Sequence, residues 1–415
     1  MSSTHKSLLD PEIVRSPYAY YDELRRDTPI AYFPEIKGYF VTSYDLVKLI
    51  VRDPRFQKAP LLPGTADGRK FAIPNKAAQA VLLADTEIGL PVHTISESDG
   101  KRQTQVRRIV DPYLNTKASQ AKEAVIRSCA TDLLDDLGNA EGCDVVSEFS
   151  SPYTVYVLCE LLGFPRSMHK QLKAYADAAL TYLVYTVSEE EAVEGAKTMV
   201  AMHQIMREML HERQKNPRDD LLTAIATAVV DGEPLSDRHK IYMVEELIVG
   251  GNETTANAIN GGLTHLAQHP ELQDRLRQTP SEIPAFVEEA LRLLSPIQSA
   301  HRIPSVDVEL AGVKVPAGSK IYLGTAAANR DEQKFACPAG FDHTRPDASQ
   351  HVSFGGGLHF CAGMHITRIE QRIAYEEWLK RYSSITLGQK VESIQFHTTF
   401  ATRAPVSIQL RMKRA

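Results

Sequence analysis

The stretch His351-Val-Ser-Phe-Gly-Gly-Gly-Leu-His-Phe-Cys-Ala-Gly-Met364 decides how the rest of the chain is interpreted. Its three consecutive glycines, residues 355–357, let the backbone take positive φ values and approach a neighbour closely. From Met364 to about Leu379, apolar residues recur at steps of three and four, which predicts a helix. Cys361 is therefore expected on a loop built for close approach, just before that helix begins.

A cysteine in this place is suited to act as a thiolate. The unpaired N–H groups and partial positive charge of a helix N-terminus lower a thiol pKa. A thiolate held there can bind a soft or borderline metal ion. The alternative is a small buried cysteine behind a glycine-rich turn, and for a loop of this kind taken alone that alternative is the commoner case.

The spacing of five residues in the loop favours a metal-binding thiolate over a small buried cysteine. Phe354, Gly357, His359, Cys361 and Gly363 fit Phe-x-x-Gly-x-His-x-Cys-x-Gly, which resembles the haem-ligand signature of the cytochrome P450 family. The resemblance implies that Cys361 is the axial thiolate on the iron of haem b. It implies that Phe354 packs beside the ligand loop and that His359 reaches a haem propionate. Backbone N–H groups after the cysteine, with Gly363 in that position, would temper the charge on the sulfur.

A basic helix is predicted over residues 100–110. A solvated charged face is the ordinary explanation of such a run of Lys and Arg. The family has a haem-facing helix here with a His-x-x-x-Arg-Arg pattern, which aligns with residues 103, 107 and 108. This chain has Gln103 in place of the histidine, so one propionate contact is in doubt, whereas Arg107 keeps its place and suits a carboxylate.

The longest helical pattern covers residues 236–268 and contains Val249-Gly-Gly-Asn-Glu-Thr-Thr255. Two glycines inside a helix cost about 1 kcal/mol each relative to alanine, so a structural reason for them is expected. The plain explanation is that the Thr254 hydroxyl bonds to the Gly250 carbonyl and bends the helix. The resemblance instead implies an oxygen-binding helix in which Glu253 and Thr254 are an acid–alcohol pair that supplies protons.

Residues on the same helix are expected to border a substrate pocket, among them Val249 and Gly250. Glu246 lies eight residues before Thr254, roughly 80° around the helix, where the family usually has an apolar residue. An unpaired carboxylate there would be costly, so Glu246 is expected to meet a polar substrate group, an arginine or water. Further along the chain, Ile297 and Gln298 are also expected to line the pocket.

Glu289 and Arg292 are spaced i,i+3 on a predicted helix, where such pairs are usually solvated. They resemble the family's Glu-x-x-Arg, which implies a buried structural pair completed by Arg345. Arg302, six residues after Pro296, is at the position of the family's second propionate arginine.

Composition indicates an ordinary globular protein with 43% hydrophobic and 24% charged residues among 415. The net charge of −5 gives no sign of nucleic-acid binding. No run of ~20 apolar residues predicts a membrane span, and the first ten residues lack the apolar core of a signal peptide. Five scattered cysteines fit a reducing compartment, so a cytoplasmic location is expected.

The fold class predicted is mainly α with a smaller β region, the cytochrome P450 fold, as a single domain over residues 1–415. The α-rich body is expected at about 43–295 and 361–385, with one helix over 118–137. The β-rich parts are expected at about 28–42, 301–324 and 393–412, the last as a closing hairpin.

The function that the resemblance implies is a haem-thiolate monooxygenase that puts one oxygen atom of O2 into a small organic substrate. Electrons would come from a separate ferredoxin and ferredoxin reductase, and the chain is expected to be a monomer. The alternatives are a peroxide-driven haem-thiolate oxidase and a non-enzymatic haem-binding sensor. A basic docking face for the redox partner is expected from five cations, namely Lys101, Arg102, Arg108, Arg368 and Arg372.

Overall fold

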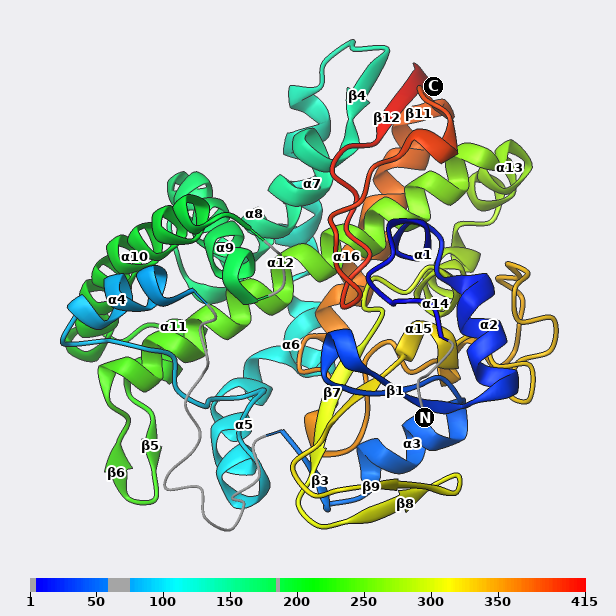
Figure 1. Ribbon diagram of the computed structural model, residues 1–415. Helices are drawn as coiled ribbons and strands as arrows, with labels where there is room; N and C mark the ends of the chain where they lie inside the picture. Colours follow the sequence, from blue (N-terminus) through cyan, green and yellow to red (C-terminus); the bar gives the residue numbers. More distant parts are fainter. Residues whose placement is uncertain (1–4, 59–74, 184–186) are drawn as a thin grey trace.

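The structure is a computed structural model that describes residues 5–58, 75–183 and 187–415, and it is mainly helical with smaller sheets (Figure 1). The helices of the first half are α1 (Pro11–Arg15), α2 (Tyr18–Asp27), α3 (Tyr44–Arg52), α4 (Lys76–Ala84), α5 (Gly100–Leu114), α6 (Thr116–Ala121), α7 (Glu123–Asp136), α8 (Ser151–Leu162), α9 (His169–Leu183) and α10 (Glu189–Lys215). The second half has α11 (Leu221–Ala226), α12 (Asp237–Gln268), α13 (Pro270–Gln278), α14 (Ile283–Leu293), α15 (Thr325–Ala328) and α16 (Met364–Arg381).

The strands form several small sheets. The largest has the order β1-β2-β10-β7-β3, in which β10 runs parallel to β2 and the other described pairs are antiparallel. Its strands are β1 (Ile30–Phe33), β2 (Gly38–Val41), β3 (Phe56–Gln57), β7 (Ala300–Pro304) and β10 (Lys320–Leu323). The other sheets pair β11 (Tyr382–Leu387) with β12 (Gln409–Arg414) and β12 with β4 (Gly142–Asp144), β5 (Val229–Val230) with β6 (Glu233–Pro234), and β8 (Val308–Leu310) with β9 (Val313–Val315).

The long helix α12 runs through the middle of the molecule and separates two hydrophobic cores (Figure 1). Ser236 caps its N-terminus by accepting a hydrogen bond from the His239 N–H. Residues 241–248 of α12 belong to the core around α8–α11, whereas residues 258–267 belong to the core around α7, α14 and α16. The stretch between them, which holds the two glycines, is therefore where the helix passes from one core to the other.

Several expected boundaries were wrong. The helix expected over 118–137 is interrupted at Lys122, where α6 ends and α7 begins. The helical pattern after Cys361 stops at Arg381, and residues 382–387 continue as β11. In the tail, residues 395–406 form an irregular hairpin with a bridge between Phe396 and Pro405. The strand after it, β12, pairs instead with β11 and β4. This pairing was not predicted because both partner strands are distant from β12 in sequence.

Among the described helices, none is both long enough and apolar enough to cross a membrane.

Candidate active site

The glycines before Cys361 let the loop lie directly against the end of α3. Gly357 has a φ of 64°, and a Cβ added there would lie 1.9 Å from the carbonyl oxygen of Val51. A Cβ on Gly356 would lie 2.6 Å from the Val51 side chain. The loop closes on itself through the Cys361 N–H, which donates to the Phe354 carbonyl at 3.0 Å. The expected close approach is therefore present, and a side chain at either glycine would push the loop away from α3.

Cys361 lies deep in the molecule, yet part of its surface remains accessible. Burial raises the pKa of its thiol above the ordinary value, while the Gly363 N–H and the charges of Arg107 and Arg368 oppose the rise. The N-terminus of α16 acts in the expected direction through the Gly363 N–H, but desolvation outweighs it. A cation on the sulfur would favour the thiolate.

The middle of α12 has one face that borders open space. Gly250 is exposed although its helix is central, and a Cβ added there would meet no atom within 4 Å. A Cβ on Gly251 would instead lie 2.8 Å from the Leu158 side chain. The Thr254 hydroxyl donates to the Gly250 carbonyl at 2.7 Å, which is the helix-return bond expected from sequence. That bond uses the hydroxyl proton, so in this rotamer Thr254 presents acceptor lone pairs.

Two further polar groups on α12 face its neighbours. The Asn257 amide donates to Glu253 Oε1 at 3.3 Å. The Thr255 hydroxyl lies 3.2 Å from the hydroxyl of Thr367 on α16 and also bonds to the Glu370 carboxyl. Burial raises the pKa of Glu370 well above its usual range, which favours the neutral form of this carboxyl. No local pattern singled out Glu370, because a carboxylate in a helix is most often on the surface.

The cysteine loop and the open face of α12 belong to one region. The hydroxyl contact between Thr255 and Thr367 joins α12 to α16 a few residues after Cys361. On the other side, Val249 and Ala362 pack against the same hydrophobic core. The chain segments that flank Cys361 and Gly250 are therefore linked by direct contact on one side and by a shared core on the other.

Gln103 and Arg107 hold the cysteine loop by its backbone. Gln103 is 1% exposed, and its side-chain amide donates to the Leu358 carbonyl at 2.8 Å. Arg107 donates to the Phe360 carbonyl at 2.6 Å and pairs with Asp111 at 2.8 Å. Their predicted contact with propionates stays a prediction, since in the described structure both residues are donors to the loop.

His359 and Arg302 gather near the start of α5. The His359 Nε2 atom lies 3.2 Å from the Asp99 carboxylate, and Arg302 is 5% exposed with one guanidinium bond, to the His301 carbonyl at 2.8 Å. Burial lowers the pKa of Arg302, although the carboxylates of Glu97 and Asp99 oppose this. A buried guanidinium and an imidazole side by side are suited to bind an anionic group.

The residues present fit a haem held by a cysteine thiolate. Within the described chain, the buried Nδ1 atom of His359 has no hydrogen-bond partner, and the guanidinium of Arg302 donates to the His301 carbonyl. These are donors suited to carboxylates, as the two propionates of a haem require. The accessible surface of Cys361 and the empty space beside Gly250 provide for the iron ligand and for room above it.

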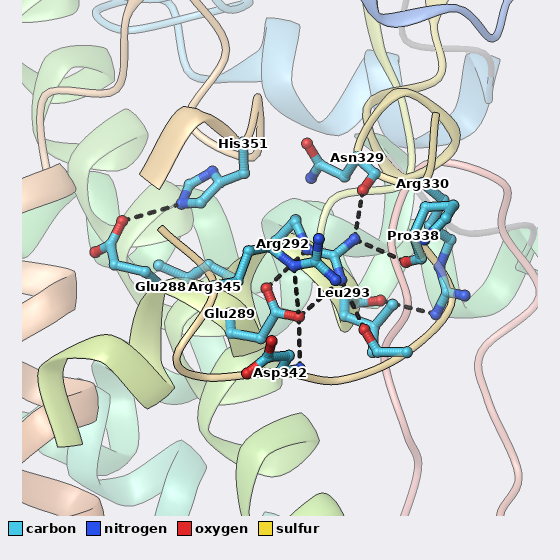
Figure 2. Close-up of polar contacts among 12 residues, drawn as sticks. Glu288, Glu289, Arg292, Leu293, Asn329, Arg330, Pro338, Asp342, Arg345 and His351 are labelled. Carbon is cyan, nitrogen blue, oxygen red and sulfur yellow. Dashed lines mark hydrogen bonds and ion pairs between the residues drawn. The ribbon is translucent and has the colours of Figure 1, made fainter. Parts of the chain in front are cut away.

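A buried array of charges supports the loop that carries Cys361 (Figure 2). Glu289 and Arg292 are both 0% exposed and form two hydrogen bonds, at 2.7 and 2.8 Å. Arg345 Nε donates to the same carboxylate at 3.3 Å, as does the Asp342 N–H at 2.9 Å. The remaining donors of Arg292 reach backbone carbonyls, namely those of Asn329, Pro338 and Gly340.

Two links between this array and the loop were not foreseen from the sequence. The Asn329 side chain accepts from the Val352 N–H at 2.7 Å and donates to the Ser353 hydroxyl at 2.8 Å. Glu288, next to the expected glutamate, lies 3.5 Å from His351 (Figure 2) and forms a two-point pair with Arg368. The adjacent carboxylates at 288 and 289 were the only signal for the second link.

The other pocket candidates are in varied surroundings. The Glu246 carboxylate accepts from the Ile95 N–H at 2.6 Å and from the Ser96 hydroxyl at 2.8 Å. Ile297 is half-buried and forms a bridge with Thr402. Gln298 is 3% exposed, and its amide donates to the Ser295 carbonyl at 2.7 Å. The Glu246 carboxylate thus has partners in an irregular segment of the same chain, which the sequence did not predict.

Three of the five expected docking cations are engaged in ion pairs. Lys101 pairs with Asp231 at 2.8 Å. Arg368 pairs with Glu288, and Arg372 pairs with two carboxylates, those of Glu123 and Glu376 at 2.7 and 2.9 Å. Arg368 and Arg372 are therefore not free outward arginines, which leaves Arg102 and the exposed Arg108 to carry the docking hypothesis.

Comparisons with known proteins agree with this geometry. The family model described as Cytochrome P450 matches residues 75–412. The chain is 30% identical over 391 residues to Cytochrome P450 107B1 of Saccharopolyspora erythraea, covering 93% of each protein. It is 28% identical over 407 residues to Cytochrome P450 109 of Bacillus spizizenii, covering 95% of this chain and 92% of that protein.

Solved structures show the same fold. P450BioI, in complex with an acyl carrier protein ligated to hexadec-9Z-enoic acid, has a TM-score of 0.85 at 27% identity, covering 97% of this chain and 99% of that one. The myxobacterial CYP267B1, in complex with myristic acid, has a TM-score of 0.85 at 27% identity, covering 98% and 99%. CYP109E1 of Bacillus megaterium, in complex with corticosterone, has a TM-score of 0.80 at 26% identity, covering 96% and 99%.

Proposed function

Because this chain belongs to the cytochrome P450 family of monooxygenases, we propose that it inserts one oxygen atom of O2 into a C–H bond of an apolar or mildly polar small organic molecule. The observation that carries the proposal is the position of Cys361. Its thiol is deep in the molecule and still accessible, and the helix that follows it contacts α12, whose open face lies at Gly250. Such a site serves chemistry on a ligand held between a thiolate and a helix.

The cofactor is a haem, and we propose haem b, with Cys361 as the ligand of its iron. Arg302 and His359 would bind its propionates. Arg107 and Gln103 would either bind a propionate as well or keep their present hydrogen bonds to the backbone of the cysteine loop. When bound, the haem supplies the activation of O2. The Gly363 N–H, which already bonds to the sulfur, would disperse the negative charge of the thiolate.

Glu253 and Thr254 are the proposed proton-handling residues. The Thr254 hydroxyl borders the open face of α12 and, with its proton on the Gly250 carbonyl, can hold a water molecule through its lone pairs. Glu253 is the neighbouring carboxyl that could resupply protons from solvent. A proton relay of this kind needs a group that holds water at the reacting face and a second group that recharges it.

Val249, Gly250 and Ile297 are the proposed direct wall of the substrate pocket, with Glu246 and Gln298 at its border. Relatives of similar fold have been solved with a fatty acyl chain, myristic acid and corticosterone. These chemistries define a first panel for this chain: long-chain fatty acids, acyl carrier protein conjugates and steroids. Binding is measured by the difference spectrum of the ferric enzyme, and a panel without any spectral shift would refute an apolar substrate of these classes.

The electron donor is proposed to be a ferredoxin with its reductase. Arg108 is exposed on α5, and two apolar side chains of the cysteine loop, Leu358 and Phe360, are 46% and 37% exposed. A surface with apolar centre and basic edge fits a small acidic partner. We propose in addition that the chain acts as a monomer in the cytoplasm, where its five free cysteines would stay reduced.

The proposal is tested against its two alternatives by reconstitution. With NADH, reductase, ferredoxin and labelled O2, the product should carry one labelled oxygen atom only when both redox proteins are present. Equal turnover with hydrogen peroxide alone would favour the peroxide-driven oxidase. Haem binding without any product from the whole panel would favour the sensor.

A further inference from the structure

The N-terminal half of α12 holds an irregular segment of the chain, residues 85–99, which joins α4 to α5. Arg238 donates to the Leu90 carbonyl through its Nε atom at 2.8 Å and through Nη2 at 2.5 Å. Tyr242 donates its hydroxyl to the Gly89 carbonyl at 2.6 Å. Two neighbouring carbonyls of the segment are thus bound by two residues spaced four apart on one helix.

The next residue at the same spacing binds the other end of the segment. Glu246 Oε2 accepts from the Ile95 N–H at 2.6 Å and from the Ser96 N–H at 3.3 Å. Glu246 Oε1 accepts from the Ser96 hydroxyl at 2.8 Å. Backbone groups of a buried segment without regular structure must find partners elsewhere. Here α12 side chains supply them.

The ridge of residues that holds the segment continues into the open face of α12. Residues four apart on a helix are neighbours, displaced by about 40° around the axis at each step. After Glu246 the next two steps are Gly250 and Thr254. Since a Cβ on Gly250 would meet no atom within 4 Å, Glu246 lies at the border between the held segment and the open space.

We propose that Arg238, Tyr242 and Glu246 form a clasp that keeps residues 89–96 closed beside the substrate space, and that Glu246 positions this wall instead of binding the substrate itself. Buried Ile95 and partly buried Val92 lie in the held segment and pack into the core around α8–α11. Releasing the carboxylate end would loosen the wall next to the pocket while leaving Cys361 untouched. The inference rests on the proposed function only for the identity of the space that the segment borders.

The charge state of Glu246 gives the clasp a pH dependence. Burial raises the pKa of Glu246 to about 7, although the bonds from Ser96 oppose the rise. Glu97 adds to it, and Glu97 itself faces Lys58 at 3.0 Å and His301 at 4.0 Å. In a released segment Glu246 would meet water and return towards an ordinary glutamate pKa. The closed form therefore binds the proton more tightly, so raising the pH through about 7 favours release.

Hydrogen–deuterium exchange of the full-length, haem-loaded enzyme tests the clasp without substrate or turnover. Glu246→Leu removes the acceptor and should speed exchange of the amides of Ile95 and Ser96 by about ten- to a hundredfold, as expected when a buried donor loses its hydrogen-bond partner. Glu246→Gln keeps an acceptor oxygen and a neutral side chain. At pH 6 the amides of this variant should exchange at the wild-type rate. Between pH 6 and 8 wild-type exchange should rise by more than the intrinsic pH effect, and in Glu246→Gln this additional rise should be absent.

The neighbouring Glu245→Gln is the matched control, because Glu245 bonds to Tyr175 at 2.7 Å and not to the segment. It should leave exchange at Ile95 and Ser96 unchanged. Wild-type exchange rates in Glu246→Leu would overturn the clasp, and an unaltered pH dependence in Glu246→Gln would overturn its control by this carboxyl.

Two further measurements keep the result decisive. If Glu246→Leu fails to fold, Tyr242→Phe removes one hydroxyl only, and faster exchange around Leu90 is expected, whereas unchanged exchange overturns the clasp. If folded Glu246→Leu binds substrate more weakly than wild type, and Glu246→Gln binds it as wild type does, Glu246 has a positioning role. If the wild-type protein shows no haem-thiolate spectrum, the proposed function is refuted, whereas the exchange result remains valid.

Discussion

Glu288 and Arg368 join α14 to the first turns of α16, with the Arg368 Nη2 atom donating to Glu288 Oε2 at 3.0 Å. The Arg368 guanidinium lies 4.6 Å from the centre of the Phe354 ring, and its charge acts on the Cys361 thiol. Burial alone would raise the pKa of Glu288, but the neighbouring His351 and the bonds from Arg368 lower it to about 2. This carboxylate therefore stays charged and balances the guanidinium beside the cysteine loop.

Glu288→Gln should raise the haem reduction potential, because the uncompensated Arg368 charge favours the added electron. A charge at this range is expected to shift the potential by on the order of tens of millivolts. Spectroscopic redox titration measures the shift. Glu282→Gln is the control, since Glu282 pairs with Arg275 at the surface, and it should leave the potential unchanged. An unchanged potential in Glu288→Gln would show that Arg368 is balanced by other groups.

Cys361→Ser should abolish the red-shifted Soret band of the ferrous–CO complex, because serine cannot supply the thiolate. The exposed Cys337 is the control residue, and Cys337→Ser should keep the band. If the band survived in Cys361→Ser, another residue would be the iron ligand.

Thr254→Ala should keep folding, haem binding and substrate binding but lose product per NADH, with hydrogen peroxide rising in compensation. The loss of one hydrogen bond to a charged group, ~1.5–3 kcal/mol, would shift the partition between product and peroxide by about one to two powers of ten. Thr254→Ser retains the hydroxyl and is the matched control. If Thr254→Ala formed as much product per NADH as wild type, the role of Thr254 would be limited to the hydrogen bond to the Gly250 carbonyl.

Glu289→Gln should destabilise the enzyme by about 3–5 kcal/mol, because it leaves Arg292 buried without a counter-charge. Urea unfolding, followed by circular dichroism and by loss of the haem-thiolate spectrum, measures the change. The same substitution at the partly exposed Glu282, which pairs with Arg275 and His343, should have a smaller effect, since water screens these pairs. Equal effects of both variants would argue against a special role for the buried array.

Arg108→Glu should slow reduction by ferredoxin severalfold at low ionic strength and less at high ionic strength, because steering by opposite charges is screened by salt. Stopped-flow reduction across a salt series measures this. Lys390→Glu reverses an exposed charge in the C-terminal part of the chain and should change little. Equal rates for Arg108→Glu and wild type at every salt concentration would place the partner on another surface.

Local patterns carried much of the prediction. The glycine-rich loop, the helix after it and the long helix expected over residues 236–268 could be predicted because each depends on neighbours in the chain. The bond from Thr254 to Gly250 was foreseen for the same reason, since its two residues are four apart. Short strands such as β4 and β11 were missed because their pairing partner, β12, is distant in sequence.

The sequence by itself determined the family, the mainly helical fold and Cys361 as the candidate iron ligand, because spacing within ten residues is a property of the chain alone. Only the tertiary structure decided which side chains meet: Gln103 at the Leu358 carbonyl, Arg368 at Glu288, and Glu246 at the amides of Ile95 and Ser96. These partners are 80 to 255 residues apart along the chain. Packing brings them together, and buried polar groups must then find partners among whatever packing has placed nearby.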